Sequence, residues 1–195
     1  MARRSAEEIR ELGLAGAATC FRELGVAGTS VDDIVHASGV ARSTLYRHLG
    51  DRDDLLLAVT LREIEQLHAV LTARIAESSS VVDLLVEGVL GAVELVNESA
   101  VLRELLETPA LLASEVSDQG LQALVEQLVS FVEPLAEGHH GSIRPELDVG
   151  LAVECLVRTI ASLVTMRVRR ERDPDDLRRY LRQSLVPIFV PDASR

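Results

Sequence analysis

The stretch TSVDDIVHASGVARSTLYRHLGDR, residues 29–52, decides the fold of the first part of this chain. Apolar residues recur at helical spacing in both of its halves: Val31, Ile34 and Val35, then Val40, Leu45 and Leu49. Gly39 stands between the halves, where the end of a helix needs a residue that tolerates a left-handed backbone. Two helices this short cannot each bury enough apolar area alone, so we expect them to cross and share these residues. The stretch therefore predicts a helix-turn-helix.

The outward face of the second short helix carries basic and hydroxyl side chains. At about 100° per residue, Ser43 and Arg47 point away from the buried leucines, with Thr44 and Tyr46 on the flanks and Arg42 at the helix start. Arginine can donate a bidentate pair to guanine, and hydroxyl groups can bond bases or phosphates. This face predicts contact with DNA. The alternative interpretation is a solvated face in a small helical bundle.

The run GVARSTLYRHLGDRDDLL closely resembles the DNA-binding signature of the tetracycline-repressor (TetR) family of regulators. The preceding segment AATCFRELGVAGTSVDDIV is similar to the opening segment of that family, so the resemblance covers roughly residues 10–57. It implies that five residues of the second helix touch double-stranded DNA: Arg42, Ser43, Tyr46, Arg47 and His48.

The resemblance also bears on the starts of the helices. It implies that Thr29 and Arg52 grip phosphates, and we add Ser30, the other candidate cap of the first short helix, to the predicted DNA-binding residues. Two residues depart from the family pattern. Ala41 stands where a capping serine is usual, so we expect a weaker start to the second helix. Asp32 stands where a basic residue is frequent, which leaves one phosphate contact in question.

The charge of the chain is acidic overall but unevenly distributed. The 195 residues contain 20 arginines, no lysine and 31 acids, a net charge of −11. Residues 1–55 hold 7 arginines against 9 acids, a net of −2, and the other 140 residues hold 13 against 22, a net of −9. Acid is thus concentrated away from the basic cluster around Arg47. A DNA-binding part that is not net basic predicts modest non-specific affinity.

The remainder of the chain reads as helix throughout, which predicts an all-α fold. A capping serine, Ser5, starts the first helix, and Asp51 caps a long helix that runs to about Ala76. Further helices are expected over 81–98, 99–107, 110–137, 148–171 and 174–190. We predict an N-terminal three-helix bundle with the helix-turn-helix, residues 1–50, as DNA-binding domain. Residues 51–195 would form a larger helical domain for ligand binding and dimerisation.

The helix over 148–171 is apolar around most of its circumference, so it needs a second burying surface. A two-fold partner supplies one, and the alternative is a central core helix within the monomer. In the TetR family the last two long helices form a dimer bundle, which favours the homodimer. The predicted interface residues are Leu156, Ile160, Leu163, Leu181 and Leu185.

A small-molecule pocket in the C-terminal helices follows from the resemblance. The chain has only five aromatic residues, two Tyr and three Phe, so a flat aromatic ligand would find few stacking partners. We therefore expect a small hydrophobic ligand, aliphatic or lipid-like, held by an apolar wall and a few polar groups. The candidate contacts are Glu94, Asn97, Arg103, Phe131 and Arg158.

Signs of catalysis are few. Glu137, His139 and His140 invite a metal-binding interpretation, but adjacent histidines in a Gly-flanked loop favour a solvated loop. Cys20 and Cys155 have no partner motif. We expect no enzyme, cofactor or metal. The sequence has no apolar run long enough for a membrane span and no secretory signal at its start, so we expect a cytoplasmic protein without a membrane partner.

Together these patterns predict a ligand-responsive transcriptional repressor that binds a near-palindromic operator as a dimer. The alternative, from another class, is a helical small-molecule-binding or adaptor protein without sequence-specific DNA binding.

Overall fold

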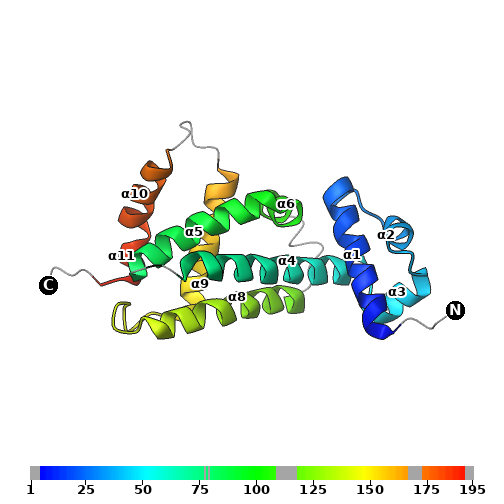
Figure 1. Cartoon of the computed structure of the whole chain (residues 1–195), viewed down its shortest axis with the longest axis horizontal. Coiled ribbons are helices and arrows are strands. Elements are labelled where there is room, and N and C mark those ends of the chain that lie inside the picture. The colour runs from blue at the N-terminus through cyan, green and yellow to red at the C-terminus, as the bar shows by residue number, and fades with distance from the viewer. Residues whose placement is uncertain (1–4, 77, 79, 109–117, 167–172, 192–195) are drawn as a thin grey trace. The chain divides into compact units, whose positions relative to one another are not determined.

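The computed structural model describes residues 5–76, 78, 80–108, 118–166 and 173–191, and all regular secondary structure within these ranges is helical. The order of the helices can be followed in Figure 1. Their bounds are α1 Ala6–Leu24, α2 Val31–Ser38, α3 Arg42–Leu49, α4 Arg52–Ile75, α5 Val81–Glu98, α6 Ala100–Glu107, α8 Asp118–Gly138, α9 Val149–Thr165, α10 Pro174–Ser184 and α11 Val186–Phe189.

The chain forms two compact units, and the division differs from the expected one at residue 50. The first unit comprises Met1–Glu65 and Glu98–Ala123, and the second comprises Gln66–Asn97 and Leu124–Arg195. The first half of α4 and the whole of α6 therefore belong with the helix-turn-helix. They join it through apolar packing, because Leu55 and Leu56 of α4 and Val101 of α6 are buried in the same core as residues of α1–α3.

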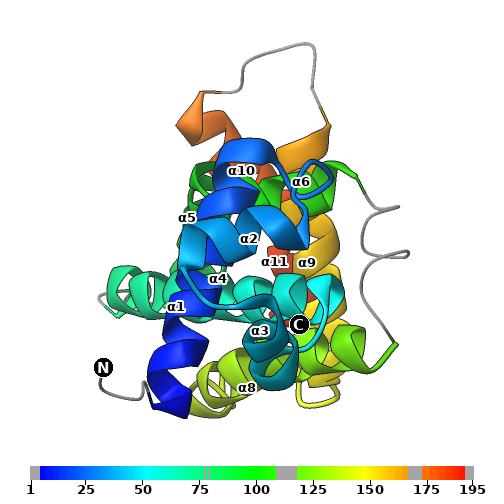
Figure 2. The same ribbon diagram turned by 90° about the vertical axis from the view of Figure 1, so that its right-hand side faces the viewer.

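The core of the first unit assembles around α1. Phe21 of α1, Ile34 of α2 and Leu45 of α3 are completely buried there. Figures 1 and 2 show α2 and α3 beside α1, joined by a short turn. The helices α1 and α2 cross closely, since a Cβ atom added at Gly16 would lie 2.7 Å from the Cβ of Ser38 and 2.9 Å from its backbone nitrogen. Only glycine fits that crossing without displacing backbone.

Local signals define the ends of α2 and α3. The hydroxyl of Ser30 accepts from the backbone N–H of Asp33, whose carboxylate accepts in turn from the backbone N–H of Ser30. Gly39 ends α2 with a φ of 62°, and its N–H donates to the carbonyl of Val35, so the predicted left-handed turn is confirmed. Helix α3 begins at Arg42, and the N-cap residue before it, Ala41, makes no side-chain cap, as the sequence predicts.

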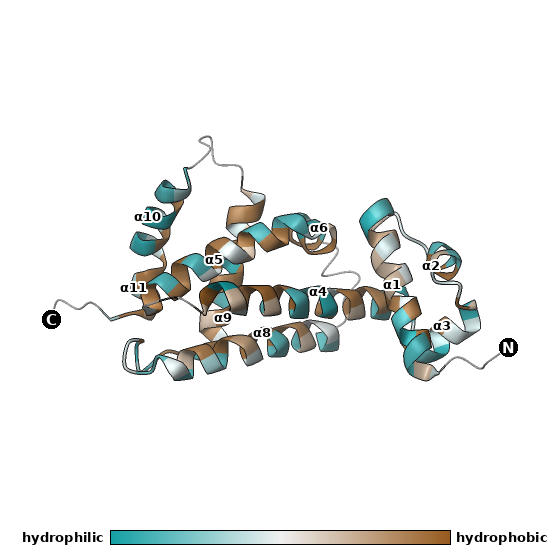
Figure 3. Ribbon diagram, in the orientation of Figure 1, coloured by the Kyte–Doolittle hydropathy of each residue, from teal (hydrophilic) through white to brown (hydrophobic). Residues whose placement is uncertain are grey.

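The second unit packs α9, α10 and α11 against α5. Leu181 of α10 and Val86 of α5 are fully buried in this core, and Phe189 of α11 is nearly so. Figure 3 shows apolar stretches, in brown, on α5, α9 and α11, whereas α10 is largely hydrophilic, in teal. None of the helices in the described ranges is both long and apolar enough to cross a membrane.

The C-terminal helices are shorter than predicted. Helix α9 covers Val149–Thr165, and the rest of the predicted helix, residues 167–171, lies outside the described residues, as do residues 110–117 of the helix expected over 110–137. The single helix predicted over 174–190 is instead two, because α10 ends at Ser184 and α11 starts at Val186. Pro187 explains the break, since proline has no N–H to continue the α10 ladder and suits the first turn of a new helix.

Candidate nucleic-acid interface and ligand cavity

Helix α3 presents its polar side chains outward on a buried apolar base. Leu45 and Leu49 are buried in the first core, which fixes the rotation of the helix. The opposite side carries the residues that we call the α3 face: Arg42, Ser43, Tyr46 and Arg47, which are exposed, and Thr44 and His48, which are half-buried. The orientation predicted from the periodicity of α3 is therefore the one observed.

Arg42 is held in place by two neighbours. Its Nη1 donates to Oδ1 of Asp32 on α2 at 2.9 Å, and its guanidinium carbon lies 5.9 Å from the centre of the Tyr46 ring. The hydrogen bond with Tyr46 and then the charge of Asp32 raise the pKa of Arg42 above its ordinary value. Arg42 thus stays charged and starts from a defined position at the beginning of α3.

Arg47 differs from Arg42 in having no fixed partner. It is exposed and makes no hydrogen bond or ion pair with any other residue that the structure describes. Its position is nevertheless determined by the helix, whose C-terminal end is tied to α1: Nη1 of Arg10 donates to the carbonyl oxygen of His48 at 2.8 Å. The guanidinium of Arg47 is therefore available to a base or a phosphate.

Arg52 and Thr29 have structural roles that correct the predicted phosphate contacts. Nε of Arg52 donates to the carbonyl of Thr29 at 2.8 Å, its Nη2 donates to the carbonyl of Val26, and only 21% of its side chain is exposed. Thr29 is 4% exposed, and its hydroxyl donates to the carbonyl of Gly25. Both side chains therefore bond backbone carbonyl groups of the loop between α1 and α2, whereas Ser30 remains exposed beside them.

Glu104 is a structural residue of this loop that the sequence did not suggest. Its carboxylate accepts from the backbone N–H of Val26 at 2.8 Å and from that of Ala27 at 3.3 Å. Arg52 of α4 binds the carbonyl group of Val26, and Glu104 of α6 binds its N–H group, so both helices hold the same loop residue. Glu104 is 78 residues away from Val26 along the chain, so no local pattern could have identified it.

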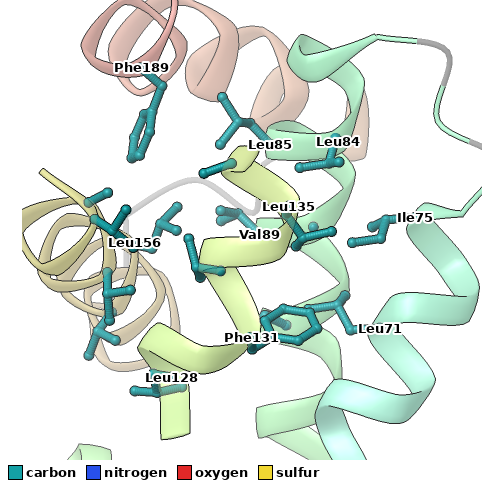
Figure 4. A pocket seen from close by; sticks show the side chains of 18 of the residues that line it. Leu71, Ile75, Leu84, Leu85, Val89, Leu128, Phe131, Leu135, Leu156 and Phe189 are labelled. Atoms are coloured by element: carbon teal, nitrogen blue, oxygen red, sulfur yellow. The ribbon is translucent and has the colours of Figure 1, made fainter. Parts of the chain in front are cut away.

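The second unit encloses an apolar cavity of about 140 Å³. Figure 4 shows its wall, with Leu71 and Ile75 from α4, Val89 from α5 and Phe131 from α8 pointing toward one another, joined by Leu156 and Phe189. Phe131 is stacked on the imidazole of His68, with ring centres 4.1 Å apart and an angle of 8° between the planes. An apolar wall with few polar groups is typical of small-molecule sites.

Of the five predicted ligand contacts, Phe131 alone lines this cavity. Glu94 pairs with Arg74 at 2.6 Å, and Arg158 pairs with Glu154 at 2.6 Å. Asn97 and Arg103 are exposed. His68 lines the cavity and was missed, although its place beside Leu67 and one turn before Leu71 puts it on the apolar stripe of α4.

The predicted dimer residues separate into two groups. Leu181 and Leu185 are 0% and 2% exposed within this chain, so these two are not available to a partner. Leu156 and Ile160 are half-buried and line the cavity. Helix α9 is in part a core helix of the monomer, which accounts for its apolar circumference. Leu163 is different, because it lines a shallow surface hollow formed by α9 and α10.

The histidine loop and the cysteines have ordinary structural surroundings. The Nδ1 atom of His139 lies 2.8 Å from the carbonyl oxygen of Leu135, at the end of α8. No group of three His, Cys, Asp or Glu side chains suited to a metal occurs among the described residues. Cys20 is buried in the first core, and this burial raises the pKa of its thiol, which keeps it protonated.

Comparison with known proteins also points to a DNA-binding regulator. Residues 14–59 match the family model of bacterial regulatory proteins, tetR family. Over 59 residues the chain is 32% identical to the HTH-type transcriptional repressor AcnR of Corynebacterium glutamicum. This match covers 30% of the chain and 31% of that repressor, so the chain matches about a third of the length of this curated relative.

Solved structures share the whole fold. The fatty acid degradation regulator FadR of Bacillus halodurans has a TM-score of 0.60 at 19% identity, covering 93% of this chain and 95% of that one. The TetR family repressor AlkX of Dietzia sp. strain DQ12-45-1b, implicated in biodegradation of n-alkanes, has a TM-score of 0.62 at 21% identity, covering 91% and 93%.

The helix-turn-helix, its outward α3 face and the larger helical unit define the class of DNA-binding transcriptional regulators. Within that class, residues 14–59 carry the DNA-binding segment of the tetR family of bacterial regulatory proteins.

Proposed function

We propose that the protein is a dimeric repressor in the cytoplasm whose hold on a near-palindromic operator is released by a small apolar ligand. The observation that carries the proposal is the α3 face, where Arg42, Ser43, Tyr46 and Arg47 are exposed above the buried Leu45. A helix that enters the major groove with its N-terminal residues needs this arrangement, in which a buried side fixes the helix and a polar side meets bases.

A second copy of the chain is the proposed partner of the surface hollow on α9 and α10. Leu151 is 67% exposed there and Tyr180 is 42% exposed, next to Cys155 and Leu163. Large apolar side chains that gather on one face are typical of protein interfaces. Two copies joined through this hollow would present two α3 faces, and each would read one half-site of the operator.

The cavity of the second unit is the proposed ligand site. Its wall consists mainly of leucine, isoleucine, valine and alanine side chains, with two phenylalanines and His68, which favours an aliphatic ligand over a flat aromatic one. Two structural neighbours, a regulator of fatty acid degradation and a repressor implicated in biodegradation of n-alkanes, are associated with aliphatic compounds, in agreement with this ligand class.

Helix α4 is the proposed route from ligand to DNA. Its second half supplies Leu71 and Ile75 to the cavity wall, and its first half supplies Leu55 and Val59 to the core under α2 and α3. A ligand that prefers one position of α4 would bias the spacing of the two α3 faces. A preference of about 1–3 kcal/mol changes operator affinity by about 5–150-fold.

The test is a footprint of the purified protein on the DNA that flanks its own gene. We expect one protected near-palindrome with a half-site spacing of about one helical turn or a multiple of it. An adaptor protein without sequence-specific binding would instead protect no particular site, and that result would reject the proposal.

A further inference from the structure

The wall of the cavity in the second unit is chemically uniform except at one residue. Of the 24 described residues that line it, only His68 has a polar side chain. Small-molecule sites usually combine an apolar wall with a small number of polar groups that orient the ligand. In this wall the imidazole of His68 is the one such group. A ligand with several polar groups would therefore leave most of its polar groups unpaired, at a cost in affinity.

The position of His68 suits it to bind one end of an elongated ligand. Its ring is stacked on Phe131, with 4.1 Å between the ring centres, so one face of the imidazole is covered. Both ring nitrogens lie on the edge, where hydrogen bonds form in the plane of the ring. Figure 4 shows Phe131 and Phe189 on opposite sides of the cavity. Because the imidazole of His68 is stacked on Phe131, it lies on the Phe131 side of an otherwise apolar space.

We propose that the ligand is a single-chain aliphatic carboxylic acid, with its chain in the cavity and its carboxylate bound by His68. This inference rests on the proposed ligand site and names its chemistry. A plain hydrocarbon would make no use of the imidazole. A carboxylate accepts a stronger hydrogen bond from an imidazole N–H than a neutral oxygen does, because the acceptor is charged.

The size of the cavity limits the length of the chain. A dry cavity of about 150 Å³ lined by Leu, Ile and Phe is known to hold benzene, a six-carbon hydrocarbon. The present volume of about 140 Å³ is similar. We therefore expect about six carbons to be enclosed and the carbons nearest the carboxylate to lie beside His68, which makes octanoate a suitable probe.

Two substitutions separate the head of the ligand from its chain. His68→Phe keeps a flat ring for the stack on Phe131 and removes both nitrogens. Gly88→Leu fills the cavity from α5: a Cβ atom at Gly88 meets only Ile75 Cγ2 at 3.9 Å, so the backbone accepts a side chain there. Leucine is also a better helix former than glycine, so the variant is expected to fold.

The experiment is titration calorimetry of the full chain and both variants with octanoate, 1-octanol and octylamine at one pH. We expect the parent to bind octanoate about tenfold or more tightly than octanol, the advantage of a charge-assisted hydrogen bond. His68→Phe should lose this preference and still bind octanol, and Gly88→Leu should bind neither compound. Circular dichroism checks that both variants keep the helical content of the parent.

Two other results would overturn the inference in distinguishable ways. If His68→Phe binds octanoate as the parent does, or if the parent prefers octanol or octylamine, the carboxylate assignment is wrong while the cavity remains the ligand site. If none of the three compounds binds the parent, the assignment and the proposed ligand site both fail, and the footprint of the protein on its operator still tests DNA binding separately.

Discussion

The guanidinium of Arg42, at the start of α3, lies 2.9 Å from the carboxylate of Asp32 near the start of α2. Both side chains are more than half exposed, so the pair lies on the surface that the α3 face presents. An acid in this place repels phosphates, but it also fixes a guanidinium that would otherwise sample many rotamers. Asp32, the residue that departs from the pattern of the family, is thus the partner of the first arginine of α3.

Removing the charge of Asp32 should separate affinity from specificity. In Asp32→Asn the phosphates lose a repelling charge and Arg42 is released, so binding to random duplex DNA should strengthen and its salt slope should steepen by about one contact per subunit. Preference at the base that Arg42 reads should weaken. Asp33→Asn is the matched control. It removes the same charge one residue further along α2, from a carboxylate that bonds Ser30 and not Arg42. If both variants retain the base preference of the parent, Asp32 does not position Arg42.

Loss of Arg47 should reduce operator binding without affecting the fold. Arg47→Ala removes an exposed guanidinium that has no partner among the described residues, so thermal stability should stay unchanged. Operator affinity should fall by about 1–3 kcal/mol, with relaxed preference at one base pair. Gel shifts on operator and random DNA measure both effects. Arg179→Ala, an exposed arginine of α10 paired with Asp176, should leave them unchanged.

Arg52 should behave as a stabilising residue. Arg52→Ala leaves the carbonyls of Val26 and Thr29 without their donor, and unpaired groups of this kind cost about 1–3 kcal/mol each. Urea unfolding should show that loss, while the salt slope of DNA binding stays at the parent value. A reduced salt slope at unchanged stability would instead restore Arg52 as a phosphate contact.

A charge placed in the hollow of α9 and α10 should separate the dimer. Leu163→Glu introduces a carboxylate beside exposed Leu151 and Tyr180, where an apolar partner surface is expected. Light scattering should report a monomer, and operator affinity should fall with it. Val125→Glu changes an exposed apolar residue of α8 and should leave the dimer intact. A dimeric Leu163→Glu would place the interface elsewhere.

The crossing at Gly16 should tolerate no side chain. Gly16→Ala forces a methyl group to within 2.7 Å of the Cβ of Ser38 and 2.9 Å of its backbone nitrogen, so α1 and α2 must separate. The expected loss is about 1–3 kcal/mol of unfolding free energy, measured in urea. Gly138→Ala is the control: the space around Gly138 is open to 4 Å, and its stability should change little.

Periodicity and turn residues were sufficient to predict the helix-turn-helix. Leu45 and Leu49 recur at helical spacing, Gly39 marks the turn, and both signals act between neighbours in the sequence. The orientation of the α3 face follows from the same rule. For these elements the local pattern and the packed structure agree, so the sequence alone defines them.

The missed residues depend on contacts between distant segments. Arg52 has the position of a phosphate-binding residue in the sequence, and only the packed loop reveals that backbone carbonyls occupy its donors. Leu181 and Leu185 form an apolar stripe, but a stripe does not say whether the same chain or a second one covers it. Polar residues such as Glu94 were chosen as ligand contacts because they lie on amphipathic helices, and most such residues are paired with neighbours or solvated.

The hold of Glu104 on the backbone of Val26 and Ala27 limits how this regulator can be divided. A fragment ending at residue 65 contains the complete helix-turn-helix but lacks α6, and with it the acceptor for two backbone N–H groups and the cover that Val101 and Leu105 provide for the core. Exchange of N-terminal segments between relatives at that boundary would leave the same gap. The smallest transferable DNA-binding unit is therefore discontinuous in sequence, and a chimaera that keeps its specificity has to carry α6 along with α1–α4.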